Sequence, residues 1–399
     1  MYNLNRTAPF TINTMRILVL LSTGLVLTFA QNSALLQEFI AGNQRFTVEL
    51  YKEVRKGTDG NFLINPLSLQ MIMSLALIGE SDEDFRKIFS TLQRPEATLD
   101  ESKEMFTQIV ANLDKTGDST IASANRIFVK KGLEIGEDLK VSAVNNFKSE
   151  IEEINFLARS SISKINRWVG QNTFDEGVQM VTDKSFSKKT KSVLVNLQYF
   201  KGYWQKSFPT RATKPGPFYV SETVTKQVEL MEVFTNFKYA YNQSLRAQFI
   251  EIPLRDSDMF MTVILPDDKY GLPRLEERID ELFYEQFYYG PKVRFVLPKF
   301  DIKATAQLDD ALRNMGMEGA IGENSGNPDD NKFQVTNVYQ KAIIIVSEDG
   351  QMPPARRGKI QGTPPWVQIV VNFVADHPFL FYLKSPGAGV FFIGRYVSP

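Results

Sequence analysis

Two residue types that carry much of protein chemistry are almost missing from this chain. Its 399 residues include no cysteine and a single histidine, His377. Without cysteine there is no disulfide, no thiol nucleophile and no cysteine-based metal site. His377 alone would have to serve any serine–histidine hydrolytic pair or histidine zinc site. The sequence therefore argues against a hydrolase or metalloenzyme, and we expect no enzyme activity, no metal and no cofactor.

Net charge is also missing, because 46 basic residues balance 46 acidic ones. No overall field favours nucleic acid or an anionic membrane, so neither is expected as a partner. Hydrophobic residues make up 43% of the chain, enough for a large core that needs no disulfides. No Pro/Gly-rich linker divides the sequence, and we expect a single domain.

An apolar run near the N-terminus is typical of a secretory signal. Arg16 precedes the run Ile17 to Leu27, and Thr28-Phe29-Ala30 ends it with a small residue. The run is short for a membrane span. We predict a signal peptide at residues 1–30, a domain at 31–399, and a secreted, extracellular protein with no membrane attachment after cleavage. A signal anchor is the alternative.

One N-glycosylation acceptor, Asn242-Gln243-Ser244, falls in the expected mature chain. A second match, Asn5-Arg6-Thr7, lies upstream of the expected signal. Asn242 is a candidate glycosylation site, and an unmodified loop asparagine is the alternative.

Hydrophobic spacing divides the chain into a helical first half and a strand-rich second half. Helices are predicted at 33–56, 67–79, 161–169 and 308–315, the last ended by Gly316. Strands are predicted at 124–129, 193–200, 226–233, 247–253, 259–265, 293–297, 342–346, 379–383 and 390–395. The nearly continuous apolar run at 193–200 indicates a strand covered on both faces. This order is an α+β pattern.

Four blocks, spread over nearly the whole expected mature chain, share their spacing with one known family. The most specific runs from Asn196 to Phe208 and includes Phe200-Lys201-Gly202 and Trp204. The others are Leu297 to Phe300, Ala375 to Phe379 and Phe391 to Pro399. Together these blocks resemble the serpins.

The resemblance implies the serpin fold, with three β-sheets, eight or nine helices and an exposed reactive-centre loop. In inhibitory members a serine protease cuts that loop and becomes acylated. The loop then inserts as a new central strand of the main sheet, and the dragged protease is distorted before it is released. The resemblance also implies extracellular serine proteases as partners and a monomeric protein.

A polar cluster beneath the opening of the main sheet is implied as well. Asn65 and Gln340 are its positions in this chain, and the wider shutter and breach region of the sheet also includes Ser68, Asn196 and Trp204. The family usually has serine at the position of Asn65 and histidine at that of Gln340. We expect an Asn65–Gln340 amide pair to replace the serine–histidine hydrogen bond, and loss of that interaction is the alternative.

The loop entrance, Glu348-Asp349-Gly350, fits the family, but the hinge after it departs from the family pattern. Inserting members continue with small residues, because alternate side chains of the new strand face inward. The hinge here reads Gln351-Met352-Pro353-Pro354-Ala355-Arg356-Arg357. The residues expected to face inward are Gln351, Pro353, Ala355 and Arg357.

Two features of this hinge oppose insertion. Proline lacks the N–H that a central strand needs, and Pro353 and Pro354 would each cost roughly 3 kcal/mol by analogy with helix interiors. Arg357 would be buried without an obvious partner, which is costly. We therefore predict a non-inhibitory or substrate-like serpin. A functional inhibitor that inserts its loop is the alternative, and a storage or scaffold protein is the second.

The sequence predicts the region that contains the scissile bond, not the bond itself. Counting forward from Gly350 reaches Pro364, and counting back from Pro378 reaches about Val367. The candidates are Pro364, Pro365, Trp366 and Val367. Trp366-Val367 suits a chymotrypsin-like enzyme weakly.

Two further segments have a structural and a functional interpretation. Lys184, Lys188, Lys189 and Lys191 are predicted to form a solvated face rather than a glycan-binding site. The aromatic run from Leu282 to Tyr289 is predicted to pack against the body rather than to bind a partner.

Overall fold

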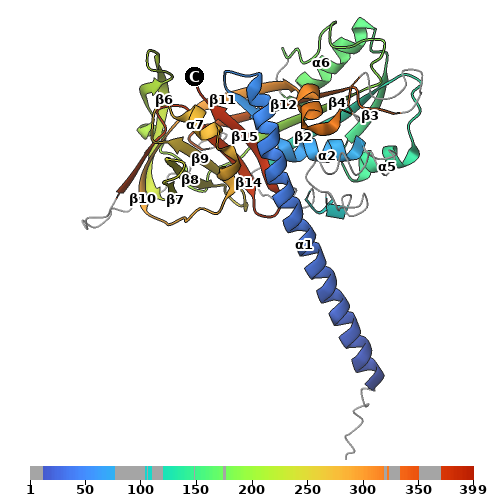
Figure 1. Cartoon of the computed structure of the whole chain (residues 1–399), viewed down its shortest axis with the longest axis horizontal. Helices are drawn as coiled ribbons and strands as arrows, with labels where there is room; N and C mark the ends of the chain where they lie inside the picture. The colour runs from blue at the N-terminus through green and yellow to red at the C-terminus, as the bar shows by residue number, and fades with distance from the viewer. Residues whose placement is uncertain are drawn as a thin grey trace, which may run out of the picture.

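The fold is seen in a computed structural model of the chain. The described residues are 12–76, 104–105, 107–109, 120–147, 149–173, 177–318, 321–322, 333–349 and 370–399. They form three β-sheets covered by helices (Figure 1). The predicted α+β class with three sheets is confirmed. The predicted count of eight or nine helices concerns the whole chain, part of which lies outside the described residues.

The first helix, α1 (Ile12–Lys56), is longer than the helix predicted from Ser33. Its N-terminal part projects away from the body, and its C-terminal part crosses the body (Figure 1). Phe46, Leu50 and Tyr51 are fully buried there and fix the helix to the core. The expected end of the signal peptide, Ala30, falls within α1 and stays a prediction. None of the described helices has an apolar stretch long enough to cross a bilayer.

The remaining described helices are shorter. They are α2 (Pro66–Ala76), α5 (Glu137–Asn145), α6 (Arg159–Thr173), α7 (Leu272–Glu276), α8 (Asp309–Leu312), η1 (Thr210–Ala212), η2 (Ile279–Phe283) and η3 (Arg313–Met317). The predicted 308–315 helix is α8 followed by the π-helical turn η3. Gly316, with φ 103°, breaks the helical backbone inside η3, because glycine adopts positive φ without a steric penalty.

A six-stranded antiparallel sheet forms one side of the main core. Its order is β1-β15-β14-β9-β8-β7. The strands are β1 (Phe62–Ile64), β15 (Gly389–Tyr396), β14 (Phe379–Ser385), β9 (Phe260–Pro266), β8 (Ala247–Pro253) and β7 (Lys238–Asn242). The predicted 247–253 strand is β8.

A four-stranded sheet has the order β13-β10-β6-β5. Its strands are β13 (Val370–Val374), β10 (Lys292–Pro298), β6 (Thr225–Asn236) and β5 (Lys214–Tyr219). The edge strand β13 pairs in parallel with β10, from Val370 opposite Lys292 to Val374 opposite Val296.

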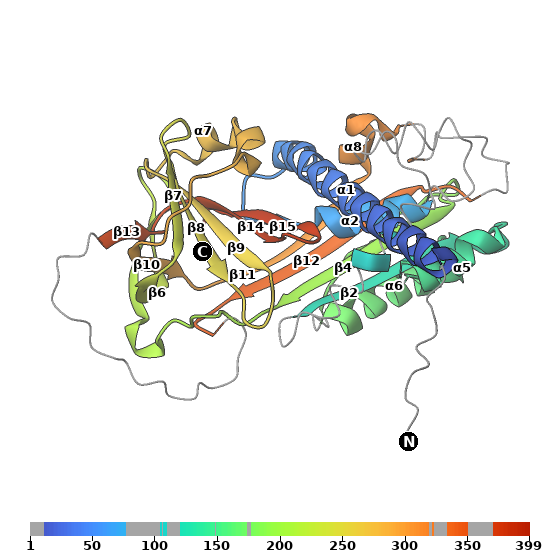
Figure 2. The same cartoon turned by 90° about the horizontal axis from the view of Figure 1, so that it is seen from below.

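A five-stranded sheet has the order β11-β12-β4-β2-β3 (Figure 2). Its strands are β11 (Phe300–Gln307), β12 (Asn337–Val346), β4 (Ser192–Lys201), β2 (Thr120–Lys130) and β3 (Ser149–Ile154). The central strands β12 and β4 pair in parallel, from Asn337 opposite Val193 to Ile344 opposite Phe200. We call this pairing the β4–β12 seam.

Both faces of the seam are covered. On one face Leu194 and Phe200 join the main core, to which α1 and α2 also contribute. On the other face Val193 and Val195 join a second, smaller core with Ile165 of α6. The burial of both faces explains why β4 is mostly apolar, as the sequence indicated.

Candidate functional site

The candidate functional segment is the loop that connects the five-stranded sheet to the four-stranded sheet. It leaves the five-stranded sheet after β12, is described to Asp349, and resumes at Val370 on the edge of the four-stranded sheet. The predicted hinge residues from Gly350 to Ala355 and the predicted scissile region Pro364 to Val367 lie outside the described residues. The structure therefore bears on the entrance and the exit of this loop.

Backbone and indole contacts hold the loop entrance. Trp204 is fully buried, and its Nε1–H donates to the carbonyl of Ser347 at 2.8 Å. The Trp204 N–H donates to the carbonyl of Asp349 at 3.3 Å, and the Phe208 N–H donates to that of Glu348 at 2.9 Å. The spacing of the Asn196–Phe208 block thus places two residues against the start of the loop.

The Glu348 carboxylate is held by two further side chains. Thr213 Oγ1 donates to Glu348 Oε1 at 2.9 Å, and Lys299 Nζ lies 3.0 Å from Oε2. Burial acts to raise the pKa of Glu348, but hydrogen bonds from its own backbone, Lys299 and Thr213 outweigh it and lower that pKa. The first residue of the predicted entrance is therefore an anchored anion.

The structure brings Asn65, Ser68, Asn196 and Gln340 into one polar cluster, but not through the expected amide pair. The Gln340 side chain accepts from the Asn65 backbone N–H at 2.7 Å and donates to the Asn65 carbonyl at 2.9 Å. The Asn65 side chain turns away from Gln340 and accepts from the Ser68 N–H at 2.8 Å. The replacement for the serine–histidine bond thus joins a side chain to backbone, because Asn65 caps the start of α2.

Asn196 extends the cluster across the β4–β12 seam. Its Oδ1 accepts from Gln340 Nε2 at 2.7 Å, and its Nδ2 donates to Asn125 Oδ1 at 2.6 Å. Asn196 faces Gln340 on one side and Asn125 on the other in the sheet register. One buried side chain therefore connects β12, β4 and β2.

Gln198 and Ser68 complete this cluster. The amide nitrogens of Asn196 and Gln198 both donate to Ser68 Oγ at 2.5 Å, and Gln198 Nε2 also donates to Ser123 Oγ at 2.7 Å. Gln198, Ser123 and Asn125 were not predicted as site residues. The cluster holds α2 against the β4–β12 seam. Insertion of a new strand between β4 and β12 would have to break hydrogen bonds of this cluster.

The exit of the loop is fixed by Asp376 and His377. His377 is 5% exposed; its Nε2 bonds the carbonyl of Pro266 and its Nδ1 bonds Asp376 Oδ1, both at 2.8 Å. The Asp376 carbonyl accepts from the Tyr219 N–H at 2.8 Å. The single imidazole of the chain thus bonds the end of β9 and the neighbouring Asp376, and it forms no hydrogen bond with a serine or threonine hydroxyl among the described residues.

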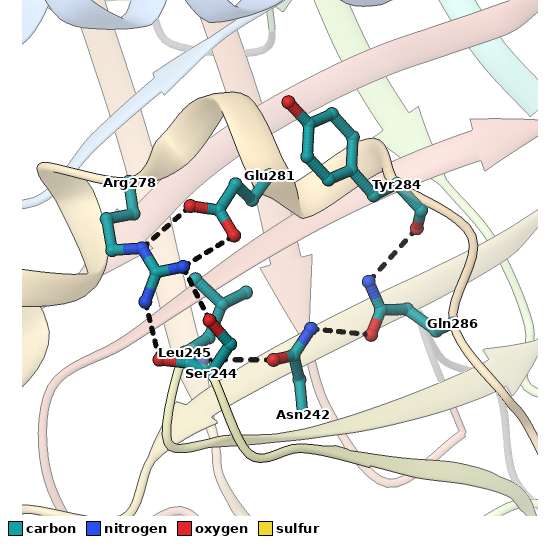
Figure 3. A network of polar contacts seen from close by, with 7 residues as sticks. All are labelled: Asn242, Ser244, Leu245, Arg278, Glu281, Tyr284 and Gln286. Atoms are coloured by element: carbon teal, nitrogen blue, oxygen red, sulfur yellow. Dashed lines mark hydrogen bonds and ion pairs between the residues drawn. The ribbon is translucent and has the colours of Figure 1, made fainter.

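Asn242 ends β7 and lies in a polar network (Figure 3). Its Nδ2 donates to Gln286 Oε1 at 3.1 Å, and its Oδ1 accepts from the Leu245 N–H at 2.9 Å. Ser244 Oγ accepts from Arg278 Nη2 at 2.7 Å. The glycosylation acceptor is thus a structured turn at the surface.

The two remaining segments have mixed outcomes. Lys184, Lys188 and Lys189 are exposed, whereas Lys191 is 8% exposed. In the aromatic run, Phe283 packs on Tyr382 with ring centroids 5.2 Å apart. Phe287 is instead 93% exposed, so the prediction that the whole run packs is wrong for part of it. From Glu285 to Tyr289, exposed residues alternate with partly buried ones.

Comparison with known proteins assigns the chain to a protein family. A family model described as "Serpin (serine protease inhibitor)" matches residues 41–399, and the chain belongs to the serpin family. Members of this family act on serine proteases rather than catalysing a reaction of their own, which agrees at the family level with the expected lack of enzyme activity.

Individual relatives and structures support this assignment. The chain is 27% identical to leukocyte elastase inhibitor of Sus scrofa, over 91% of this chain and 100% of that protein. It is 29% identical to antichymotrypsin-2 of Bombyx mori, over 88% and 96%. Among solved structures, serpin48 of Tenebrio molitor superposes with a TM-score of 0.81 at 27% identity, covering 91% and 98%. Uncleaved ovalbumin, with a TM-score of 0.78 at 24% identity over 91% and 100%, shares the fold.

Proposed function

We propose that this serpin presents residues 350–369 to extracellular serine proteases and is cut as a substrate, without trapping the enzyme by full loop insertion. The observation that carries this proposal is the composition of the β4–β12 seam together with that of the hinge. A trap requires a new strand between β4 and β12, and the hinge residues are its first part.

The seam would impose two hydrogen-bonded neighbours on an inserted strand. Each residue of a central strand donates its N–H to one neighbour or the other. Pro353 and Pro354 have no N–H, so two consecutive residues would leave carbonyl groups of β4 or β12 unpaired. These carbonyls are now paired across the seam, from Val193 to Phe200 on β4.

The seam offers no partner for Arg357. Neither β4 (Ser192–Lys201) nor β12 (Asn337–Val346) contains an aspartate or glutamate. β12 instead carries Lys341, which is 3% exposed. An arginine entering between these strands would therefore find no carboxylate on either one.

Secretion is the second part of the proposal, supported by the basic–apolar–small pattern of residues 1–30. Expression of the full chain in eukaryotic cells tests it. We expect the protein in the medium, with a new N-terminus near Gln31, and retention in the cell would contradict secretion.

Inhibition by insertion is the second candidate, and three observations favour it. The loop entrance is anchored through Trp204 and Glu348, and the polar cluster under the seam is complete. Relatives such as leukocyte elastase inhibitor and antichymotrypsin-2 are named as inhibitors. Both candidates require a loop that a protease reaches, and they differ in the fate of the cleaved protein and of the protease.

Mixing the purified protein with trypsin, chymotrypsin and elastase separates the two candidates. A substrate gives two fragments and leaves the protease active, whereas an inhibitor gives a covalent complex that survives SDS. We expect cleavage with full recovery of protease activity. A covalent complex in near-stoichiometric yield would contradict the non-inhibitory proposal.

A further inference from the structure

An aromatic surface lies along the open edge of the six-stranded sheet. The loop after η2 runs beside the edge strand β7, and Tyr239 and Tyr289 exchange N–H···O bonds of 2.9 and 3.0 Å. This loop exposes Tyr284 at 63%, Phe287 at 93% and Tyr289 at 55%. We call Tyr284, Phe287 and Tyr289 the aromatic loop.

Aromatic side chains exposed to this extent form a candidate contact surface. A Phe side chain has no hydrogen-bonding group, so Phe287 gains nothing from contact with water. Exposed apolar patches on soluble proteins mark binding surfaces or sites of aggregation. The question is which chemical group lies close enough to cover this one.

A hydrogen bond joins Asn242 to Gln286, which lies between Tyr284 and Phe287 of the aromatic loop (Figure 3). Asn242 Nδ2 donates to Gln286 Oε1 at 3.1 Å, and Gln286 Nε2 donates to the Tyr284 carbonyl at 3.0 Å. Gln286 precedes Phe287 in the chain. A group attached to Asn242 Nδ2 would therefore begin beside the aromatic loop.

We propose that Asn242 carries an N-linked glycan whose first sugars cover the aromatic loop. This proposal rests on the secretion proposed above. Pyranose rings have apolar C–H faces that pack on aromatic rings, while their hydroxyls stay in water. The glycan thus suits a surface of one phenylalanine and two tyrosines, and it would replace an aggregation hazard by a solvated surface.

The covalent step is transfer of an oligosaccharide from a lipid pyrophosphate donor. A bond forms between Asn242 Nδ2 and the first anomeric carbon, and the bond from that carbon to the pyrophosphate oxygen breaks. Nδ2 loses one proton, and the lipid pyrophosphate leaves. The modified nitrogen keeps one hydrogen, which can still be donated to Gln286 Oε1.

The hydrogen bonds of the folded turn imply that the transfer precedes folding. Ser244 Oγ accepts from Arg278 Nη2 at 2.7 Å, and the Asn242 amide is engaged on both its atoms. The acceptor asparagine and its hydroxyl partner are therefore both occupied once Arg278 is in place. The glycan would be added while the chain is being made, and the network would close around it.

Expression in eukaryotic cells tests whether Asn242 is modified. One form keeps its own residues 1–30, and a second has a heterologous secretion signal in their place. Enzymatic removal of N-glycans converts a modified asparagine to aspartate, and mass spectrometry of the peptide that contains position 242 detects the resulting gain in mass. We expect this gain in most of the secreted protein. An unmodified Asn242 in protein secreted by the heterologous signal would overturn the proposal, whereas failure of the own-leader form alone would contradict secretion.

Dye binding tests whether the glycan covers the aromatic loop. Asn242→Gln and Ser244→Ala remove the glycan through different residues, and Ser244→Ala keeps the Asn242 side chain. Both should bind several-fold more of a fluorescent dye specific for apolar surface than the glycosylated protein. Adding Phe287→Ser to either variant should return dye binding to the glycosylated level. Equal dye binding with and without the glycan would overturn the covering role.

Discussion

At the scale of single residues, the functional part of this molecule depends on a few buried polar side chains. Gln340, Asn65 and Asn196 are each at most 1% exposed, and their amide groups bond one another or nearby backbone. Such a network is favourable only while every member is paired. A buried polar group without a partner has lost its hydrogen bonds to water and gained none in the protein.

Gln340→Ala tests this dependence. It would leave the Asn65 N–H, the Asn65 carbonyl and the Asn196 Oδ1 without their present partner. We expect the free energy of unfolding to fall by about 3 kcal/mol, measured as a lower urea midpoint. Gln227→Ala removes an exposed glutamine from β6 and should change the midpoint little. Equal effects of the two substitutions would show that the cluster adds no stability.

The residues of this cluster differ in how far sequence could reveal them. Asn196 lies in a strand predicted at 193–200, and Gln198 is two residues further along. Two-residue spacing places both on one face of a strand, so this spacing was a usable signal for Gln198. Thr213 and Lys299 had no such signal, because only the tertiary fold brings them to Glu348. The bonding of Gln340 to backbone rather than to the Asn65 side chain likewise depended on the turn into α2.

At the scale of elements, one arginine adds to the apolar contacts that hold α6 on the five-stranded sheet. Arg126 on β2 forms ion pairs with Glu150 and Glu152 of β3. Its guanidinium also lies 4.7 Å from the ring centroid of Trp168 on α6. Arg126 is therefore a clamp between two strands and the helix that covers them.

Arg126→Met tests the clamp. It keeps much of the apolar side chain but removes the ion pairs and the cation–π contact, which together contribute about 1–2 kcal/mol. We expect faster hydrogen exchange of the α6 amides with a smaller change at α2. Lys140→Met removes an exposed helix pair with Glu137 and serves as the control. Unchanged exchange in α6 would show that its apolar face alone holds it.

Elements with strong periodicity were predicted well, and those set by tertiary contact were not. The predicted 247–253 strand and β8 coincide because apolar residues and Pro253 bound it clearly. β5 and β7 were not predicted, since each is short and has a polar, partly exposed pattern. The β4–β12 seam joins strands more than a hundred residues apart, so local sequence gives no sign of their parallel pairing. The family resemblance implied three sheets, and the pairing of these two strands was not predicted.

At the scale of the whole molecule, buried tyrosines couple stability to alkaline pH. Burial raises the pKa of Tyr396 to about 12, and burial is the main cause of the same value for Tyr382. Burial and Glu276 also raise the pKa of Tyr51, whose hydroxyl donates to Glu276 at 2.6 Å. The folded chain thus keeps protons that the unfolded chain releases near pH 10.

The sign of the pH effect follows from these raised pKa values. The stability is fully present below about pH 10, the ordinary tyrosine value, and is lost as the pH rises toward 12. We expect the urea midpoint to fall between pH 9.5 and 11.5 (roughly the span around that value). Tyr396→Phe should flatten this fall, whereas Tyr284→Phe, at an exposed site, should not. A fall of equal steepness in both variants would assign the effect to other groups.

The hinge decides whether the molecule as a whole changes state after cleavage. An inserted loop would add a strand to the five-stranded sheet and raise the melting temperature of the cleaved protein. For the natural chain we expect no large rise, because Pro353, Pro354 and Arg357 oppose the first steps. Pro353→Thr with Pro354→Ala removes opposition of roughly 6 kcal/mol, and Arg357→Ala removes the buried charge as well.

The triple variant should therefore gain what the natural chain lacks. After limited cleavage within residues 350–369, we expect its melting temperature to rise well above that of the uncleaved form. Pro364→Ala with Pro365→Ala removes the same number of prolines far from the hinge, and it should behave like the natural chain. The comparison separates an effect of hinge position from one of proline content. A large rise for the cleaved natural chain would mean that the β4–β12 seam opens despite its hinge, and that Pro353, Pro354 and Arg357 do not prevent insertion.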